Sequence, residues 1–360
     1  YAILSHTWGT EEVTFDDINR HRRVAMKLEG CQKVRNFCRI AANDGWEYAW
    51  IDTCCINKSD VNELSDAINS MFRWYERTEV CYAFLVDVPR RYSPDNVDKT
   101  DQIPWHWYFR SSRWFTRGWT LQELLAPPFL LFFAQSWNGI GSRESLTEEV
   151  SIVTGISPDQ LLEFRSCSVA TKLSWAAHRQ TTKVEDRAYS LLGLMGMNMP
   201  MIYGEGENAF IRLQHELIRK YDDETVPLWE GTGRLLAKSP DDFSKSKDLI
   251  VWPSDKERRG FAITKAGLAI NAELLESCAS VDSNQYRHYA IQLNCARSWP
   301  ALKSYRSPMI LRLLSTEGSA STFFHRSTNI ASGLETWRDA NFLSTWRSLG
   351  RRDIIVAHSK

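Results

Sequence analysis

The chain has 360 residues, a length that predicts about two structural units and leaves room for at least one large hydrophobic core. Lysine plus arginine and aspartate plus glutamate are equal at 44 each, so the overall charge does not indicate a nucleic-acid binder. Eight cysteines without a regular spacing, two of them adjacent at Cys54 and Cys55, are typical of reduced thiols in a cytoplasmic protein and not of a disulfide scaffold.

Apolar runs do not reach the length of a membrane span. The longest, residues 124–134, is interrupted by Pro127 and Pro128 and is far shorter than the roughly 20 residues that a spanning helix needs. The sequence opens on Tyr1 inside a strand-like run with no methionine, so we expect an upstream segment, and any targeting signal within it, to lie outside this sequence. The cytoplasmic assignment therefore depends on the thiols alone.

Short apolar runs and helical periodicities alternate through the first part of the chain. Residues 1–5 predict a buried strand that ends in a turn at 7–10, and the apolar spacing within 28–42 predicts a helix. Residues 48–52 predict a second strand, residues 64–75 a strongly amphipathic helix, and residues 80–86 a central parallel strand. This alternation favours an α/β fold with an open parallel sheet, in which ligands bind at the carboxyl ends of the strands.

The remaining elements follow in chain order. Residues 91–107 predict a polar loop, 119–125 a helix and 128–133 a strand, whereas 158–220 is helical in pattern, with clear segments at 185–195 and 208–219. Residues 222–255 are rich in charge, serine and proline and predict a linker or long connection. Short strand candidates at 262–270, 289–293, 309–314 and 354–357 predict a β-rich second unit.

Three segments carry a family resemblance. Tyr1–Gly9, Trp50–Lys58 and Arg117–Pro127 resemble, in the same order, the three blocks that define the fungal heterokaryon incompatibility (HET) domain, and 182–194 and 201–213 resemble the region that commonly follows. The resemblance implies a HET domain over 1–221, with a TIR-like (flavodoxin-like) core over about 1–137 and a helical extension over 138–221. Residues 222–255 would then connect this domain to a β-rich region over 256–360.

HET domains are distantly similar to TIR domains, and one short segment tests that similarity. Many TIR domains begin their third helix with Trp, a small residue, Leu, any residue, Glu and Leu, and residues 119–124 have this spacing. Glu123 falls where enzymatic TIR domains keep the glutamate that cleaves the nicotinamide–ribose bond of NAD. Nicotinamide leaves as a neutral ring, so a single carboxylate that stabilises the developing oxocarbenium charge is sufficient. The resemblance thus implies NAD as substrate, no required cofactor and Glu123 as the catalytic residue.

The other needs of a nucleotide site are a phosphate cradle, a ribose contact and flat surfaces for the rings. The segment after the first strand can supply the cradle through backbone N–H groups, an arginine can pair with pyrophosphate, and a carboxylate can bond a ribose hydroxyl. Tryptophans can stack on the rings. The candidates are Ser5, His6, Thr7, Trp8, Gly9, Asp52, Arg113, Arg117 and Trp119.

Each candidate also has a structural interpretation. Glu123 can pair with Arg117 or occupy the first turn of its helix, where negative charge is favoured. Trp8 and Trp119 can be core aromatics. In the same way, Asp52 can stabilise its loop and His6 can be an ordinary buried histidine.

Two further patterns do not predict sites. Adjacent Cys54 and Cys55 lack the C-x2-C spacing of zinc ligands, so we expect no metal site. The stretch 204–207 has the sequence GEGE, which lacks the Lys-Ser/Thr of a phosphate loop. We interpret it as a tight turn before a helix that starts near Asn208.

Two classes of function remain open at this stage. The first is a cell-death effector of fungal incompatibility and innate immunity that hydrolyses NAD when oligomerised. The second is a non-catalytic module that signals through self-association or through an upstream incompatibility or NLR-type partner, and a nucleotide sensor without turnover is a third possibility. The enzyme hypothesis requires Glu123 to face an open cleft beside the loop at 5–9.

Overall fold

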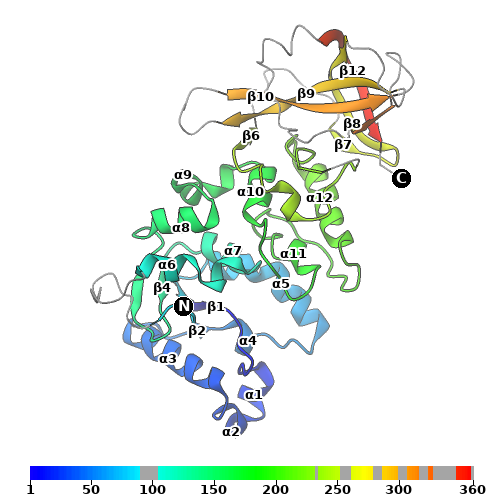
Figure 1. The fold of residues 1–360 in the computed structure, drawn as a ribbon. Coiled ribbons are helices and arrows are strands. Elements are labelled where there is room, and N and C mark those ends of the chain that lie inside the picture. The colour runs from blue at the N-terminus through cyan, green and yellow to red at the C-terminus, as the bar shows by residue number, and fades with distance from the viewer. Residues whose placement is uncertain are drawn as a thin grey trace. The chain divides into compact units, whose positions relative to one another are not determined.

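The computed structural model describes residues 1–89, 104–231, 234–251, 261–278, 286–298, 306–315, 323–326 and 346–357. The chain forms two compact units (Figure 1). The N-terminal unit comprises Tyr1–Phe164 and Arg179–Tyr203, and the C-terminal unit comprises Arg165–His178 and Gly204–Lys360. The domain limits expected from the sequence, at 221 and 255, stay predictions.

The N-terminal unit contains a five-stranded sheet with the order β2-β1-β3-β4-β5. Its strands are β1 (Ala2–His6), β2 (Ala49–Trp50), β3 (Val80–Phe84), β4 (Leu130–Phe133) and β5 (Gly139–Ser142). The first four run parallel, and β5 pairs antiparallel with β4. Every residue of β1 and β3 is buried, as expected for strands covered on both faces. The open, mainly parallel α/β sheet predicted from the sequence is confirmed.

Helices cover both faces of this sheet (Figure 1). Because successive side chains of a strand point to opposite faces, Leu4 packs with Phe37 of α3 (Glu29–Asn43), whereas Ser5 meets Glu123 of α7 (Thr120–Leu125). The longest helix among the described residues, α5 (Val61–Glu76), is capped by Asp60, whose carboxylate accepts two backbone N–H bonds. The other helices of this unit are α1 (Phe15–Asn19), α2 (Arg22–Ala25), α4 (Asp52–Cys55), α6 (Trp105–Arg110), η1 (Arg113–Thr116), α8 (Thr147–Thr154), α9 (Pro158–Leu162) and α11 (Asp186–Tyr189).

Some element limits differ from the sequence-based expectation. The second strand is shorter than 48–52, because Asp52 already begins α4. The helix expected over 185–195 is regular only in α11, and the following turns bring Gly193 against Phe72 of α5, where a Cβ atom would lie 2.0 Å from the Phe72 Cβ. The loop expected at 91–107 lies mostly outside the described residues, and Trp105 begins α6.

The C-terminal unit combines helices with an antiparallel sheet. Its strands are β6 (Leu249–Val251), β7 (Ala262–Ile263), β8 (Gly267–Ser277), β9 (Arg287–Ser298), β10 (Arg306–Ser315), β11 (Phe323–Arg326) and β12 (Trp346–Ala357), in the order β6-β9-β10-β11-β12-β8-β7. A further pairing of β8 with β9 closes β8 to β12 into a barrel. Each strand predicted after residue 256 overlaps one of these strands.

The helices of the C-terminal unit are α10 (Val169–Trp175), α12 (Asn208–Lys220) and η3 (Pro240–Phe243). The one-turn helix η2 (Phe164–Ser166) lies where the two units divide the chain. The connection expected at 222–255 is packed where it is described: Thr225, Val226 and Phe243 are fully buried, and Asp223 accepts a hydrogen bond from the Val169 backbone N–H at 2.7 Å. Within the described residues, no helix combines the length and apolarity needed to cross a bilayer.

Candidate functional site

A cavity of about 390 Å³ opens in the N-terminal unit at the carboxyl end of β1. Its volume is in the range of small-molecule sites. One wall is the apolar side of α5, formed by Leu64, Ile68, Met71 and Tyr75. The other walls carry polar, charged and aromatic side chains: His6, Trp8, Asp52, Lys58, Arg117, Trp119, Glu123, Lys183, Asp186 and Tyr203. An apolar wall opposite converging polar groups is typical of a ligand site.

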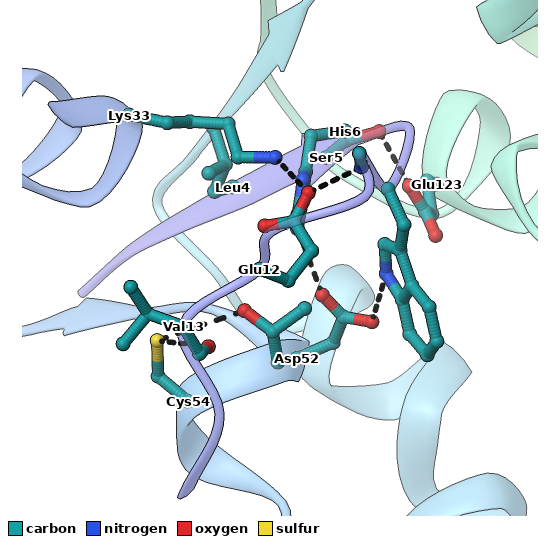
Figure 2. A network of polar contacts seen from close by, with 12 residues as sticks. Leu4, Ser5, His6, Glu12, Val13, Lys33, Asp52, Cys54 and Glu123 are labelled. Atoms are coloured by element: carbon teal, nitrogen blue, oxygen red, sulfur yellow. Dashed lines mark hydrogen bonds and ion pairs between the residues drawn. The ribbon is translucent and has the colours of Figure 1, made fainter. Parts of the chain in front are cut away.

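Glu123 is a buried carboxyl group at the cavity wall, only 9% exposed. It lies in the first turn of α7 and accepts a hydrogen bond from the Ser5 hydroxyl of β1 (Figure 2). Ser5 in turn accepts a bond from the Trp114 indole at 2.8 Å. Burial raises the pKa of Glu123 to about 8, with a further contribution from the charge of Asp52, against the opposing effects of the Ser5 hydroxyl and Arg117. At neutral pH the free site therefore holds this group mainly protonated.

Asp52 lines the same cavity, and its pKa is shifted in the opposite direction. One oxygen contacts His6 Nε2 at 3.0 Å, and the other accepts a hydrogen bond from the Trp8 indole at 2.9 Å. Burial alone would raise the pKa of Asp52, but the contacts with His6, Lys58 and Trp8 together hold that pKa below its usual value. The site thus combines an ionised carboxylate with a protonated one, a pairing that is characteristic of acid–base sites.

The loop after β1 is held from two sides, which fixes the position of Trp8. Glu12 forms an ion pair with Lys33 of α3 (Figure 2) and accepts the Gly9 backbone N–H. On α3, Gly30 permits a close approach, since a Cβ atom there would lie 2.5 Å from the Glu11 carbonyl oxygen. The Cys54 thiol donates to the Val13 carbonyl at 3.3 Å on the other side. The ring that borders the cavity is therefore attached to a braced loop.

Three cations border the cavity, and each lies near an aromatic ring. Lys58 Nζ is 3.5 Å from the centre of the Trp8 ring, and Arg117 Cζ is 5.9 Å from the same ring. Lys183 Nζ is 3.9 Å from the centre of the Tyr203 ring. Such distances are typical of cation–π pairs.

A third carboxylate, Asp186, positions two of the rings. It accepts bonds from the Tyr203 hydroxyl at 3.0 Å and from the Trp119 indole at 3.4 Å. The sequence reasoning did not single out Lys58, Lys183, Asp186 or Tyr203. The available signal was their place inside the segments 50–58, 182–194 and 201–213 that carry the family resemblance.

Arg179 is a further residue that the sequence reasoning missed. Its guanidinium is buried and donates to the Arg117 carbonyl at 3.0 Å and to the Thr120 hydroxyl at 3.2 Å. Burial lowers the pKa of Arg179 to about 10, and the charge of Glu123 opposes this shift. The neighbouring Gln180 pairs with Arg117 in an isolated β-bridge, so this segment is fixed against the start of α7. No local sequence pattern marks Arg179.

The predicted site residues divide into two groups. His6, Trp8, Asp52, Arg117, Trp119 and Glu123 come together on the cavity wall. Ser5 lies behind Glu123, and Gly9 bonds Glu12. Thr7 accepts a bond from Arg113 Nε at 3.1 Å, and the Arg113 backbone N–H donates to Asp87 at 2.8 Å, so neither Thr7 nor Arg113 contributes to the wall.

The adjacent cysteines Cys54 and Cys55 differ in solvent exposure. Cys54 is buried and Cys55 is exposed, and all eight cysteines of the chain are free thiols. Across the part of the chain that the structure describes, no three His, Cys, Asp or Glu side chains are grouped so as to hold a metal ion.

Comparison with known proteins relates this N-terminal region to one family. Residues 1–93 match the family described as Heterokaryon incompatibility protein (HET). Over 226 residues the chain is 45% identical to the vegetative incompatibility protein HET-E-1 of Podospora anserina, an alignment that covers 62% of this chain and 16% of that protein. The chain thus spans about a sixth of the length of this relative. No solved structure matches the chain.

Proposed function

We propose that the chain, whose residues 1–93 match the HET family, is a cell-death effector of heterokaryon incompatibility that cleaves the nicotinamide–ribose bond of NAD. The observation that supports this activity is the position of Glu123 on the wall of a nucleotide-sized cavity that also contains His6, Trp8 and Asp52. The strand order of the sheet is compatible with a TIR-like core, in which ligands bind at this end of the strands.

The proposed reaction is a hydrolysis. The C–N bond between ribose C1′ and the pyridinium nitrogen breaks, its electron pair stays on nitrogen, and nicotinamide leaves as a neutral ring. Water adds to C1′ and loses a proton, which gives ADP-ribose. The Glu123 carboxylate stabilises the positive charge that develops on the ribose, and the water-excluding apolar wall of α5 strengthens that interaction.

The protonation state of Glu123 links substrate binding to chemistry. In the free protein its pKa is about 8, so the carboxyl must lose a proton before it can stabilise a cation. The positive pyridinium of NAD favours the carboxylate form, since an opposite charge nearby lowers the pKa of an acid. We expect bound substrate to lower the pKa of Glu123, so that the reactive form is produced by the ligand that it acts on.

NAD loss and nicotinamide release by purified protein at high concentration test this proposal. Glu123→Gln keeps the size of the side chain and should remove turnover without loss of fold. Glu148→Gln is the matched control, because Glu148 is an exposed residue in the first turn of α8, away from the cavity. Cell killing by the wild type with no detectable turnover would contradict the enzymatic proposal.

One observation supports a non-catalytic module. The bonds of Glu123 with Ser5, and of Ser5 with Trp114, also brace α7 against β1, which is a structural role. A module that signals by self-association would keep its toxicity in Glu123→Gln as long as the protein stays folded. A nucleotide recovered intact from the wild-type protein after long incubation would instead indicate a sensor.

A further inference from the structure

The cations of the cavity have no role in the bond cleavage described above. We propose that Lys58, Arg117 and Lys183 form a subsite that binds the phosphate groups of a nucleotide. This inference rests on the proposed function and specifies its substrate class as phosphorylated ribosides and not free nucleosides.

Arg117 is the centre of this subsite. Its backbone is fixed, because its carbonyl accepts from Arg179 and the flanking Gly118 N–H donates to the Gln180 carbonyl at 2.8 Å. Its guanidinium lines the cavity, and among the described residues no hydrogen bond or ion pair engages it. An arginine offers five N–H donors in a planar fork that fits phosphate oxygens. A half-buried guanidinium that lies near the Trp8 ring, and that no described carboxylate engages in an ion pair, is therefore suited to bind an anion.

Lys58 and Lys183 can each exchange a contact with an aromatic ring for a contact with a phosphate group. Each ammonium group lies over an aromatic ring of the wall, Trp8 or Tyr203, and a cation–π contact of this kind contributes about 0.5–2 kcal/mol. A phosphate oxygen offers the ammonium group a stronger, charge-assisted bond. A ligand with phosphates and a flat base can thus attract the two lysines and occupy the ring faces that they leave.

The nearby carboxylates do not use all the hydrogen-bond donors of these cations. Asp52 lies 3.8 Å from Lys58 Nζ but is already bonded to His6 and Trp8. Asp186, near Lys183, accepts bonds from Tyr203 and Trp119. Lys58 and Arg117 also repel each other, since the charge of Arg117 adds to the burial that lowers the pKa of Lys58. An anion between these cations would relieve that repulsion.

Binding to the full chain carrying Glu123→Gln tests the subsite without turnover. Calorimetry should show that ADP-ribose binds at least about 10-fold more tightly than adenosine, and that inorganic pyrophosphate competes with ADP-ribose. Arg117→Gln should weaken ADP-ribose binding by about 10-fold and leave adenosine binding unchanged. Lys183→Gln, at an exposed position where folding is not at risk, should weaken ADP-ribose binding by several fold.

Lys27→Gln is the control, because Lys27 is exposed and lies outside the cavity. Equal binding of ADP-ribose and adenosine, no binding of ADP-ribose, or an Arg117→Gln and Lys183→Gln pair that behaves like the control would each overturn the subsite. Failure of the two proposals can be distinguished. Arg117-dependent ADP-ribose binding without NAD turnover would support the subsite and contradict the hydrolase proposal. Glu123-dependent turnover with an unchanged KM in Arg117→Gln would support the hydrolase proposal and contradict the subsite.

Discussion

Two buried glutamates, Glu123 in the N-terminal unit and Glu276 in the C-terminal unit, are compensated in different ways. In the barrel of the C-terminal unit, Glu276 pairs with Arg287 at 3.4 Å, with Arg347, and with the Tyr289 hydroxyl at 3.3 Å. Burial would raise the pKa of Glu276, but these partners, Arg347 first, hold it below the usual value. In the N-terminal unit, burial dominates and the pKa of Glu123 rises to about 8.

This difference separates a structural carboxylate from a candidate functional one. Glu276 is paired with arginines of its own unit, so its charge is already compensated within the fold. Glu123 faces a cavity and accepts a hydrogen bond from the neutral Ser5 hydroxyl, and among the described residues it forms no ion pair, so a ligand cation can still change its protonation state. Strongly perturbed groups next to a cavity are candidate catalytic groups, although ion-pair networks perturb pKa values as well.

Replacing the two glutamates one at a time tests this difference most directly. Glu123→Gln should reduce NAD turnover by at least about 100-fold, because it removes the charge that, in the proposed mechanism, stabilises the oxocarbenium ion. Glu276→Gln should leave kcat within about twofold. A turnover assay on both variants, each checked for folding by circular dichroism, measures this, and equal losses would remove the distinction.

Replacement of Arg179 tests whether its buried positive charge influences the protonation of Glu123. Arg179→Gln should lower kcat by about 10-fold with a smaller change in KM, because the start of α7 loses two anchoring bonds. It should also shift the pH dependence of turnover to higher pH, since the guanidinium charge favours the Glu123 carboxylate. Lower stability with an unchanged pH profile would indicate that Arg179 only supports the fold.

The pH dependence of turnover follows from the pKa of Glu123. In the proposed mechanism the carboxylate is the reactive form, so kcat/KM should rise with pH up to a limb near the pKa of about 8. The limb in kcat should lie at lower pH, because it reports the complex in which the pyridinium cation is bound. Initial rates across about pH 5–9 measure both limbs. Rates that fall with rising pH would instead identify Glu123 as a general acid.

Stability should respond to pH in opposite directions at the two glutamates. The pKa of Glu123 is raised from 4.5 to about 8, so its contribution to stability is complete below about pH 4.5 and is lost as pH rises through 8. The pKa of Glu276 is lowered, so its contribution is present above 4.5 and is lost as pH falls below that value.

Thermal or urea unfolding of both variants measures these contributions. Glu123→Gln should gain stability relative to wild type between about pH 6 and 9, whereas Glu276→Gln should cost about 1–3 kcal/mol near pH 7 and less in acid. A Glu123→Gln protein whose stability follows that of the wild type at every pH would show that burial does not perturb this carboxyl.

The parts of the fold that local pattern determines were predicted well. Apolar runs such as 80–86 and the helical stripe of α5 identify strands and helices, because burial on both faces or on one face leaves a periodic trace. Short elements were less predictable. Trp50 and Asp52 belong to one predicted strand, yet the chain leaves the sheet between them.

The cavity was predicted only in part, because its walls come from segments far apart in sequence. The first two blocks of family resemblance identified His6, Trp8 and Asp52, but nothing in the spacing indicated that Tyr203 would line the cavity or that Arg179 would anchor the start of α7. Spacing also could not distinguish Arg113 from Arg117. The 3-10 turn η1 begins at Arg113 and ends just before Arg117, so that Arg113 bonds Thr7 while Arg117 faces the cavity.

The most direct test of the central claim is the amount of nicotinamide released from NAD by the full chain at high protein concentration near pH 8, compared with Glu123→Gln. We expect one nicotinamide for each ADP-ribose formed by the wild type, and release by the variant at the level of the buffer blank. Equal release by the two proteins, or none from a wild-type protein that still kills cells, would contradict the assignment of catalysis to Glu123.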